Sequence, residues 1–330
     1  MTSTARHARQ NSRAGRQSTP TGRNNRSESN QMPELTGRTI SLVAVALIVL
    51  LSAKDAWAWG PMTHIAVGGQ VLDSISLLPA GIGAYLARHK LSYLYGCIAA
   101  DVVFAKRLSR VKQFCHHWST GFGLLDEAED ESDRAFAYGY LSHLAADTVA
   151  HGKFVPRQVV LSGLNVNFGH LYWELRADAM LAEDFQKPLK DLLGNNHDRH
   201  HRSMARHLKQ TFLPYDINRL LFHRMNTFAA KATFVERMER LQRSVGGRLS
   251  TKLLQQYRDE CVDRTLSIIV DGKASPVLRD DPNGTSALMQ LTVQKRELTR
   301  MRRRGLSVMR RLKESSRNFA PQLARLVPLG

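Results

Sequence analysis

The stretch Leu141–His151, with the sequence LSHLAADTVAH, places His143, Asp147 and His151 at successive steps of four residues. The residues around it are largely apolar and include no proline, which predicts a buried helix over about 135–151. Because an α-helix has about 3.6 residues per turn, side chains four positions apart lie on nearly one stripe. Two imidazoles and a carboxylate on one stripe supply half of a zinc site.

A second pair of possible ligands follows, because His170 and Glu174 also stand four residues apart. Buried histidines and acids can instead satisfy each other through hydrogen bonds, and one such pair alone would favour that interpretation. Two patterns of this kind in one short segment favour a metal site. Asp178 extends the second stripe by another turn and could hydrogen-bond to a ligand.

The rest of the chain also favours helices. The sequence lacks strand-like alternation, a glycine-rich nucleotide-binding loop and a G-x-S-x-G motif. With 330 residues, 43% of them hydrophobic, the chain can form a sizeable core. We predict an all-α fold, with a metal-binding domain over 59–213 and a helical basic region over 214–330. Besides the helix over 135–151, the expected helices cover residues 63–78, 167–184, 217–245, 251–270 and 286–319.

The N-terminal residues have the composition of a targeting segment. Residues 1–31 are polar and basic and cannot form a core, so we expect disorder. Residues 32–58 combine a basic start, an apolar run and an Ala-Trp-Ala site, which predicts a signal peptide cleaved after Ala58 and a secreted or periplasmic protein. An uncleaved anchor is the alternative, although the apolar run is short for a membrane span. Met32 is a candidate start, in which case residues 1–31 are not translated.

Cleavage after Ala58 would give the mature protein an N-terminal Trp59. A free α-amine and the first carbonyl oxygen can chelate a metal, and His64 lies five residues further on. Alternatively, Trp59 is only a core aromatic residue near the start of the first helix.

Three other positions could also bind metal. Asp101 is a lone acid in an apolar segment and is either a helix cap or a ligand. His116 and His117 are adjacent, so their side chains point in different directions and only one of them should face a metal.

The histidines of 194–207 stand among arginines and other polar residues, which predicts a solvated basic loop. The three cysteines, Cys97, Cys115 and Cys261, form no Cys-x-x-Cys pair, which excludes a zinc knuckle. A bridge between the first two is left open.

These motifs resemble, in their order, the zinc-dependent phospholipase C family. They are WGPMTH at 59–64, Ala-Ala-Asp101, His116-His117-Trp118, and the two histidine-acid patterns. The resemblance covers about 59–184 and implies an all-α phospholipase C/nuclease-like bundle around three zinc ions. It also implies hydrolysis of a phospholipid to diacylglycerol and a phosphorylated head group by zinc-activated water.

Carried over residue by residue, the resemblance implies these metal ligands: Trp59, His64, Asp101, His117, His143, Asp147, His151, His170 and Glu174. Asp147 would bridge the zinc held by Trp59 and His64 to a second zinc. The second zinc would also be held by Asp101, His117 and His143, and the third by His151, His170 and Glu174. We choose His117 because an aromatic residue follows it, and His116 is the alternative. Asp101 would also be the general base.

One spacing departs from the family. Its best-known members space the acid and the following histidine six residues apart, whereas Asp147 and His151 are four apart.

Two other functions compete with a phospholipase C. A secreted single-strand nuclease shares the zinc scaffold and the spacing of Trp59 and His64, but its last ligand is typically Asp rather than Glu174. A non-enzymatic metal-binding protein that docks on a membrane is the third possibility.

The C-terminal helices are strongly basic. The formal net charge of the chain is +18, and eleven basic and two acidic residues lie between Thr285 and Gly330. Basic helices are usually solvated, but they also favour anionic membrane surfaces, which we expect as a possible partner. No specific nucleic-acid partner is expected.

Overall fold

The computed structural model describes residues 59–103, 114–208, 211, 213–229, 231–242, 245 and 249–322. These residues form helices and no strand, so the predicted all-α fold is confirmed. None of the described helices is both long and apolar enough to cross a membrane. The predicted extension over 1–31 and signal peptide over 32–58 lie outside the described residues.

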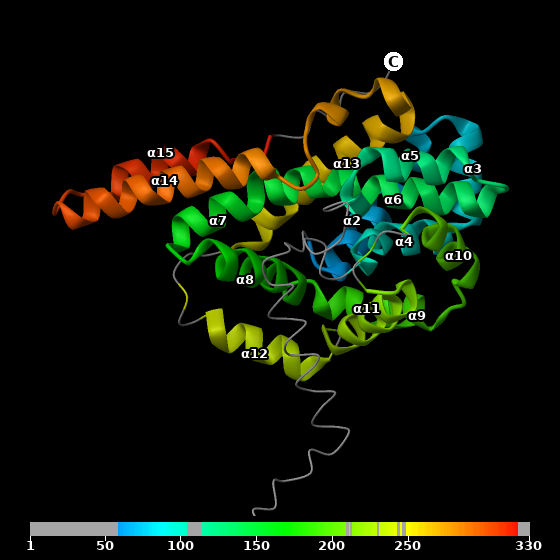
Figure 1. The fold of residues 1–330 in the computed structure, drawn as a ribbon, viewed down its shortest axis with the longest axis horizontal. Helices are drawn as coiled ribbons and strands as arrows, with labels where there is room; N and C mark the ends of the chain where they lie inside the picture. Colours follow the sequence, from blue (N-terminus) through cyan, green and yellow to red (C-terminus); the bar gives the residue numbers. More distant parts are fainter. Residues whose placement is uncertain are drawn as a thin grey trace, which may run out of the picture. The chain divides into compact units, whose positions relative to one another are not determined.

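The described residues form a succession of helices (Figure 1). The first are α2 (Pro61–Asp73), η1 (Ile75–Leu77), α3 (Ala80–Arg88), α4 (Lys90–Ala99), η2 (Ala100–Val102), η4 (Phe114–His116), α5 (Trp118–Asp126), α6 (Glu131–Val149), η5 (Ala150–Phe154) and α7 (Val155–Ser162). They are followed by α8 (Val166–Ala179), α9 (Ala182–Gly194), α10 (Asp198–His207), α11 (Tyr215–Ala229), α12 (Ala232–Gln242), α13 (Thr251–Asp271), η6 (Gly272–Ala274), η7 (Pro276–Arg279), α14 (Thr285–Arg303) and α15 (Met309–Arg317).

Helix α6 is the central element, and α2, α4, α5 and α13 pack against it (Figure 1). It begins earlier than predicted because the side chain of Asp130 accepts a hydrogen bond from the backbone N–H of Asp133 at 3.0 Å, capping the helix. With neighbours on several sides, almost all its residues from Ala135 to Val149 are buried. Its composition is accordingly apolar on most faces rather than on one stripe.

Helices α4 and α6 cross in close backbone contact at two glycines. A Cβ atom on Gly96 would lie 2.1 Å from the carbonyl oxygen of Phe136, and one on Gly139 would lie 2.0 Å from that of Tyr93. No larger residue fits at either position without moving a helix. The crossing brings the C-terminal end of α4, which leads to Asp101, alongside α6.

The helix that carries the first histidine pattern extends beyond the predicted end at about residue 151. It continues through a π-helical turn, η5, into α7, whose first turn contains Pro156. A π-turn bonds residues five rather than four apart and therefore rotates the following side chains relative to an α-helical stripe. His151 lies in this turn, so the expected single stripe is interrupted before it.

The region predicted as separate, 214–330, shares its core with the preceding helices. The described residues belong to one compact unit, and α13 packs on α6 and α2. The buried Tyr257 and Cys261 of α13 belong to the same core cluster as α6. The long helix expected over 286–319 is divided by Gly305, whose φ is +70°, into α14 and α15. These two helices run side by side, and both pack on α7 (Figure 1).

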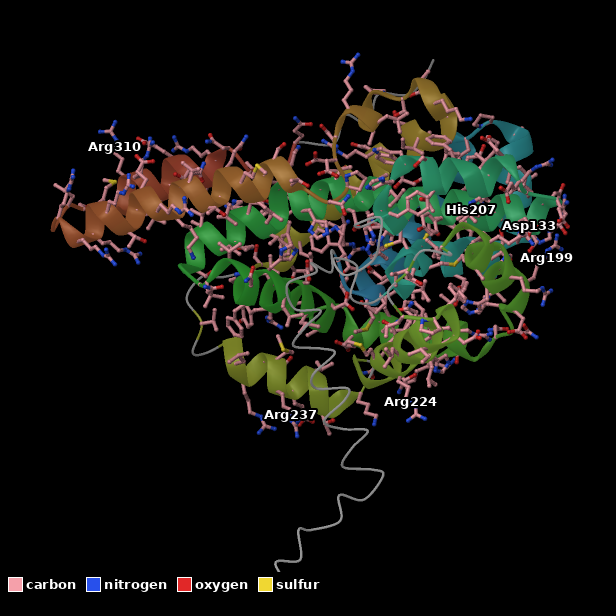
Figure 2. All side chains as sticks on the ribbon, viewed as in Figure 1. Asp133, Arg199, His207, Arg224, Arg237 and Arg310 are labelled. Carbon is pink, nitrogen blue, oxygen red and sulfur yellow. The ribbon has the colours of Figure 1, made fainter. Side chains whose placement is uncertain are left out.

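The prediction of a solvated loop over 194–207 is wrong. Residues Asp198–His207 form α10, and His197, His200 and His201 are all buried. Their rings are covered by aromatic residues of α4 and α6, which a local sequence pattern does not reveal. Arg199 lies on the exposed side of α10 and pairs with Asp133, at 2.6 Å between Nη2 and Oδ2 (Figure 2).

Candidate metal centre

His143 is at the middle of the first group of possible metal ligands. Its Nδ1 atom donates a hydrogen bond to the carbonyl oxygen of Cys97 on α4, at 2.9 Å. Because a carbonyl oxygen only accepts, the ring proton is on Nδ1, and the lone pair of Nε2 is left for another partner. That Nε2 atom lies 3.3 Å from Nε2 of His116 and 3.1 Å from a carboxylate oxygen of Asp147. This tautomer is the one in which a histidine binds metal through Nε2.

Asp147 contacts three imidazoles at once. Its Oδ1 lies 3.4 Å from Nε2 of His64, and its Oδ2 lies 3.2 Å from Nε2 of His116 and 3.1 Å from Nε2 of His143. Neither oxygen makes an aligned hydrogen bond to a described residue. Burial raises the pKa of Asp147, but the positive charge that His143 carries when it is protonated, together with the polar contacts that the three imidazoles make with the carboxylate, lowers that pKa well below its usual range. The charged carboxylate therefore suits a ligand shared between two metal ions.

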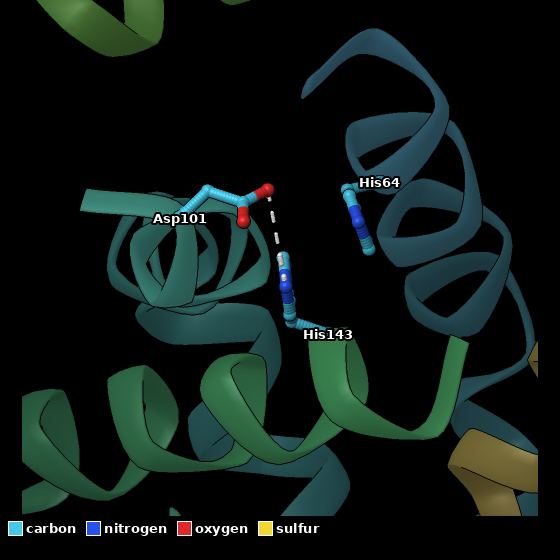
Figure 3. Close-up of side chains that lie close together, drawn as sticks. All are labelled: His64, Asp101 and His143. Carbon is cyan, nitrogen blue, oxygen red and sulfur yellow. Dashed lines mark ion pairs between the residues drawn. The ribbon is translucent and has the colours of Figure 1, made fainter. Parts of the chain in front are cut away.

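His64 and Asp101 complete this group from two other elements (Figure 3). His64 projects from α2, and its ring stacks on that of His143 with 3.9 Å between the centroids. Asp101 lies on η2, with Oδ1 3.3 Å from Nε2 of His116 and Oδ2 4.0 Å from Nε2 of His143. Burial, followed by the effect of His143, lowers the pKa of His64, so its ring is neutral and can bind metal. We call His64, Asp101, His116, His143 and Asp147 the five-residue centre.

The structure corrects our choice between the adjacent histidines. His116 is 2% exposed and lies in the five-residue centre, whereas the side chain of His117 is exposed. The hydroxyl group of Tyr140 donates to the carbonyl oxygen of Cys115, and the side-chain amide of Asn283 donates to that of His116 at 3.3 Å. These two hydrogen bonds hold η4 in place so that His116 faces α6, whereas the side chain of His117 faces away.

A second group contains His151, His170 and Glu174, and all three are buried. Nε2 of His170 lies 2.6 Å from Oε1 of Glu174 one turn further along α8. The ring of His151, from the π-turn, meets the ring of His170 edge to face, with 4.9 Å between the centroids. The structure thus brings His151 to α8, despite its short spacing from Asp147. We call these residues the three-residue group.

Asp178 supports the five-residue centre through the helix that carries His64. Its carboxylate accepts hydrogen bonds from the backbone N–H groups of Met62 and Thr63, at 3.1 and 2.8 Å, and from the Thr63 hydroxyl at 2.7 Å. A carboxylate at a helix N-terminus satisfies N–H groups that have no partner within the helix. A Cβ atom on Gly60 would lie 2.3 Å from this carboxylate, so only glycine allows the approach. Asp178 therefore positions α2 through these bonds, whereas we expected it to hydrogen-bond to a metal ligand.

Trp59 is fully buried immediately before α2. Its ring lies 4.3 Å, centroid to centroid, from that of Phe154, which ends the π-turn containing His151. The predicted chelation by its α-amine depends on cleavage after Ala58, which lies outside the described residues, and stays a prediction.

The donors in both groups fit zinc. They are imidazole nitrogens and carboxylate oxygens without thiolate, a combination typical of catalytic rather than structural zinc sites. Possible ligand atoms lie within 4.8 Å of one another in each of three triads, two of which share His143. Two ring nitrogens that face each other beside two carboxylates, as in the five-residue centre, are well matched to a cation between them. Cys97, Cys115 and Cys261 are buried and form no disulfide bond with one another, and none of them is in the triads found among the described residues.

A sequence model of the zinc-dependent phospholipase C family matches residues 63–225. Residues 63–225 belong to this family. The family match contains all eight side chains of the five-residue centre and the three-residue group. It supports a zinc-dependent hydrolase, and it runs past the boundary that we predicted at residue 213.

An uncharacterized protein of Archaeoglobus fulgidus is 31% identical over 121 residues, which are 35% of this chain and 32% of the relative. The chain therefore spans about a third of the length of the curated relative that it matches. No solved structure matches the chain.

Residues beyond the family match also contact both groups. The connection from η7 to α14 carries Asn283, which bonds to the carbonyl of His116, and Gly284, which packs on His151. A Cβ atom on Gly284 would lie 2.4 Å from Cβ of His151, and its φ of +60° also favours glycine. Sequence analysis missed this connection because nothing in its composition marks it as part of the site.

Proposed function

We propose that the protein is a zinc-dependent phosphodiesterase of the phospholipase C type, which hydrolyses a phospholipid to diacylglycerol and a phosphorylated head group. One observation carries the proposal: eight histidine and carboxylate side chains converge in two groups within the residues that match the zinc-dependent phospholipase C family. We further propose three zinc ions, two in the five-residue centre with Asp147 between them and one in the three-residue group. The chemistry that zinc supplies when bound is a lowered pKa of water and neutralisation of phosphate charge.

Asp101 is the residue we assign as general base. Its side chain is 12% exposed, whereas the other four members of the five-residue centre are at most 2% exposed. Solvent therefore reaches the centre at this carboxylate. A carboxylate at that edge can accept the proton of a water molecule that attacks phosphorus. The buried imidazoles and Asp147 have the separate task of binding metal.

We propose secretion or periplasmic export, followed by cleavage between Ala58 and Trp59. The support is the Ala-Trp-Ala site directly before the buried Trp59 and the helix that carries His64. The mass of the mature protein should correspond to a chain that starts at Trp59. A methionine added before Trp59 should reduce the zinc content, whereas a mature terminus several residues away would remove this chelate from the proposal.

We also propose that α14 and α15 hold the enzyme on an anionic membrane surface. The support for this proposal is the composition of the segment, since eleven basic and two acidic residues lie between Thr285 and Gly330. Arg310 on α15 projects into solvent with its side chain 93% exposed (Figure 2). Such attraction contributes about 1 kcal/mol per basic residue close to the surface.

The experiment that tests the reaction compares three substrates with zinc-loaded protein that begins at Trp59. They are a soluble phosphorylcholine ester, phosphatidylcholine vesicles and single-stranded DNA. We expect hydrolysis of the ester and the lipid, release of diacylglycerol, and loss of both activities with a chelator. Cleavage of DNA without either of the other substrates would identify a nuclease instead. Bound zinc without any hydrolysis would identify a non-enzymatic metal-binding protein.

A further inference from the structure

A groove separate from the five-residue centre lies between α14 and the start of α8. Its volume is about 330 Å³, and Val166 of α8 forms one side. The α14 side follows a single helical stripe, formed by Thr292, Lys295, Arg296, Thr299, Arg300 and Arg303. At 1.5 Å per residue, Arg296 is roughly 18 Å along the helix axis from Gly284, where α14 meets His151. Along α14 the arginines of the groove are therefore well separated from His151, whereas Val166 on the other side stands about one helical turn before His170.

The charge of this groove is not neutralised by nearby acids. The segment from Thr285 to Gly330 contains two acidic residues, Glu297 and Glu314. Both pair with arginines of α15, at 3.1 Å between Glu297 and Arg311 and 3.0 Å between Glu314 and Arg310. Within the described residues, no carboxylate forms an ion pair with the groove cations.

Lys295 connects the groove to the neighbouring backbone. Its Nζ atom donates to the carbonyl oxygen of Gly163, just before α8, at 3.3 Å. Burial, with the charge of Arg302 as a further cause, lowers the pKa of Lys295. The hydroxyl groups of Thr292 and Thr299 already donate to the carbonyl oxygens of Leu288 and Lys295, both at 2.8 Å, so the hydrogen-bond donors for an anion are the basic side chains of the groove.

Apolar residues continue the same face of α14 toward the metal centre. Met289 is 66% exposed and Val293 is 63% exposed, and the two stand four residues apart. On a helix of about 3.6 residues per turn they share a face with Arg296 and Arg300. Exposed apolar residues beside arginines suit the boundary between lipid head groups and acyl chains. Single-strand nucleic-acid sites instead use aromatic stacking.

We propose that this groove binds the phosphate of an anionic phospholipid that is not the substrate, while Met289 and Val293 contact the membrane interface. The lipid part of this inference rests on the proposed phospholipase function. It goes further by naming, within these basic helices, a localised site for the phosphate of one lipid. The site would hold the enzyme on the membrane while the metal centre acts on another lipid.

The test uses the zinc-loaded full chain and sedimentation with vesicles of phosphatidylcholine, with and without phosphatidic acid. Phosphatidic acid contains no phosphodiester, so the proposed activity does not consume it. The groove variant combines Arg296→Gln and Arg300→Gln. The control combines Arg224→Gln and Arg237→Gln, two exposed arginines of α11 and α12 that lie away from the groove, with the same change in charge (Figure 2). Circular dichroism checks that both variants are folded.

We expect the groove variant to lose about 30-fold in affinity for vesicles containing phosphatidic acid, the effect of two basic residues at an anionic surface. The control should lose no more than about threefold, because distant charges are screened. Equal losses of affinity in both variants would contradict a localised site and would instead indicate attraction by the overall positive charge. A groove variant that loses binding to inorganic phosphate or single-stranded DNA, but not to vesicles, would overturn the lipid assignment.

Hydrolysis of the soluble phosphorylcholine ester separates this inference from the proposed function. Both variants should retain the wild-type rate, because neither changes the five-residue centre or the three-residue group. A wild-type protein without esterase activity would reject the proposed function. Even then, the difference between the two variants in vesicle binding would show whether the groove binds anionic lipid.

Discussion

Two histidine-rich regions of the molecule are buried, but their chemistry differs. In the five-residue centre, imidazole nitrogens from α2, η4 and α6 face the carboxylates of Asp101 and Asp147. On α10, the ring of His200 stacks on Phe136, with 4.4 Å between the centroids. His201 lies between two phenol groups, with its Nε2 2.8 Å from the hydroxyl of Tyr95 and its Nδ1 2.7 Å from that of Tyr215. None of the α10 histidines belongs to a possible metal triad found among the described residues.

The comparison shows that neither the density nor the burial of histidines makes a metal site. What distinguishes the five-residue centre is that lone pairs and charged carboxylates converge on a common point. The α10 rings have partners that satisfy both nitrogens or cover the ring faces, and they stabilise packing. Substitutions in the five-residue centre should therefore affect metal binding and activity, whereas substitutions on α10 should affect stability.

The largest effect is expected from Asp147→Asn, with Asp133→Asn as the matched control on the same helix. Loss of the shared carboxylate should lower the zinc content and reduce phosphodiesterase activity by about 100-fold or more, equivalent to several kcal/mol of transition-state stabilisation. Asp133 pairs with Arg199 near α10, so its variant should keep its zinc. Metal analysis and the soluble ester assay measure both properties. Unchanged zinc and activity in Asp147→Asn would contradict the proposed centre.

The adjacent histidines of η4 provide a second test. His116→Ala should lose zinc and at least about tenfold of the activity, within the range known for residues around a metal. His117→Ala should behave like the wild type, because its side chain is exposed. A larger loss in His117→Ala, measured by the same two assays, would restore the assignment made from the following aromatic residue.

Gly284→Ala tests whether the connection beyond the family match positions His151. Both Gly284 and Gly305 have a positive φ, but the space around Gly305 is open. We expect Gly305→Ala to lower the free energy of unfolding by about 1 kcal/mol, the cost of the left-handed conformation. Gly284→Ala should cost about 2–4 kcal/mol, since the new methyl group also meets His151. Urea unfolding and zinc content are the measurements, and equal costs for the two variants would show that the contact is unimportant.

The smallest effect concerns acid stability and the α10 histidines. Burial lowers the pKa of His200 to about 4 and that of His201 to about 3. Because the unfolded chain takes up protons near pH 6.5 and the folded rings do not, these residues stabilise the fold above that pH. The stabilisation is lost as the pH falls from 6.5 toward 4.

His200→Gln should reduce the loss of unfolding free energy between pH 7 and 4.5 by about 2 kcal/mol, since one pKa unit corresponds to about 1.36 kcal/mol. Urea unfolding at the two pH values measures this difference. An unchanged pH dependence in the variant would mean that His200 is already protonated in the folded protein at acidic pH.

Local patterns were sufficient to predict the all-α fold, and they pointed to several of the histidines and acids that the structure brings together in the candidate metal centre. The step of four between His143 and Asp147 lies within a regular helix, so their proximity follows from helix geometry. His170 and Glu174 meet for the same reason. Asp101 and His64 come from other helices, and the residues alone left their roles open, so their assignment as ligands came from the resemblance to the zinc-dependent phospholipase C family.

The remaining features depend on contacts between distant segments. Gly96 and Gly139 set the crossing that brings α4 to α6, and hydrogen bonds from α6 and Asn283 orient η4. The α10 rings are covered by Tyr95 and Phe136, which precede them by many residues. No local pattern around 197–201 distinguishes a buried ring from a solvated one.

The most direct test of the central claim is anomalous diffraction from crystals of the zinc-loaded protein, recorded at the zinc absorption edge. Peaks should appear among the side chains of the five-residue centre and of the three-residue group, and none should appear beside His197, His200 or His201. A peak on α10, or zinc-loaded crystals without a peak in the five-residue centre, would contradict the account.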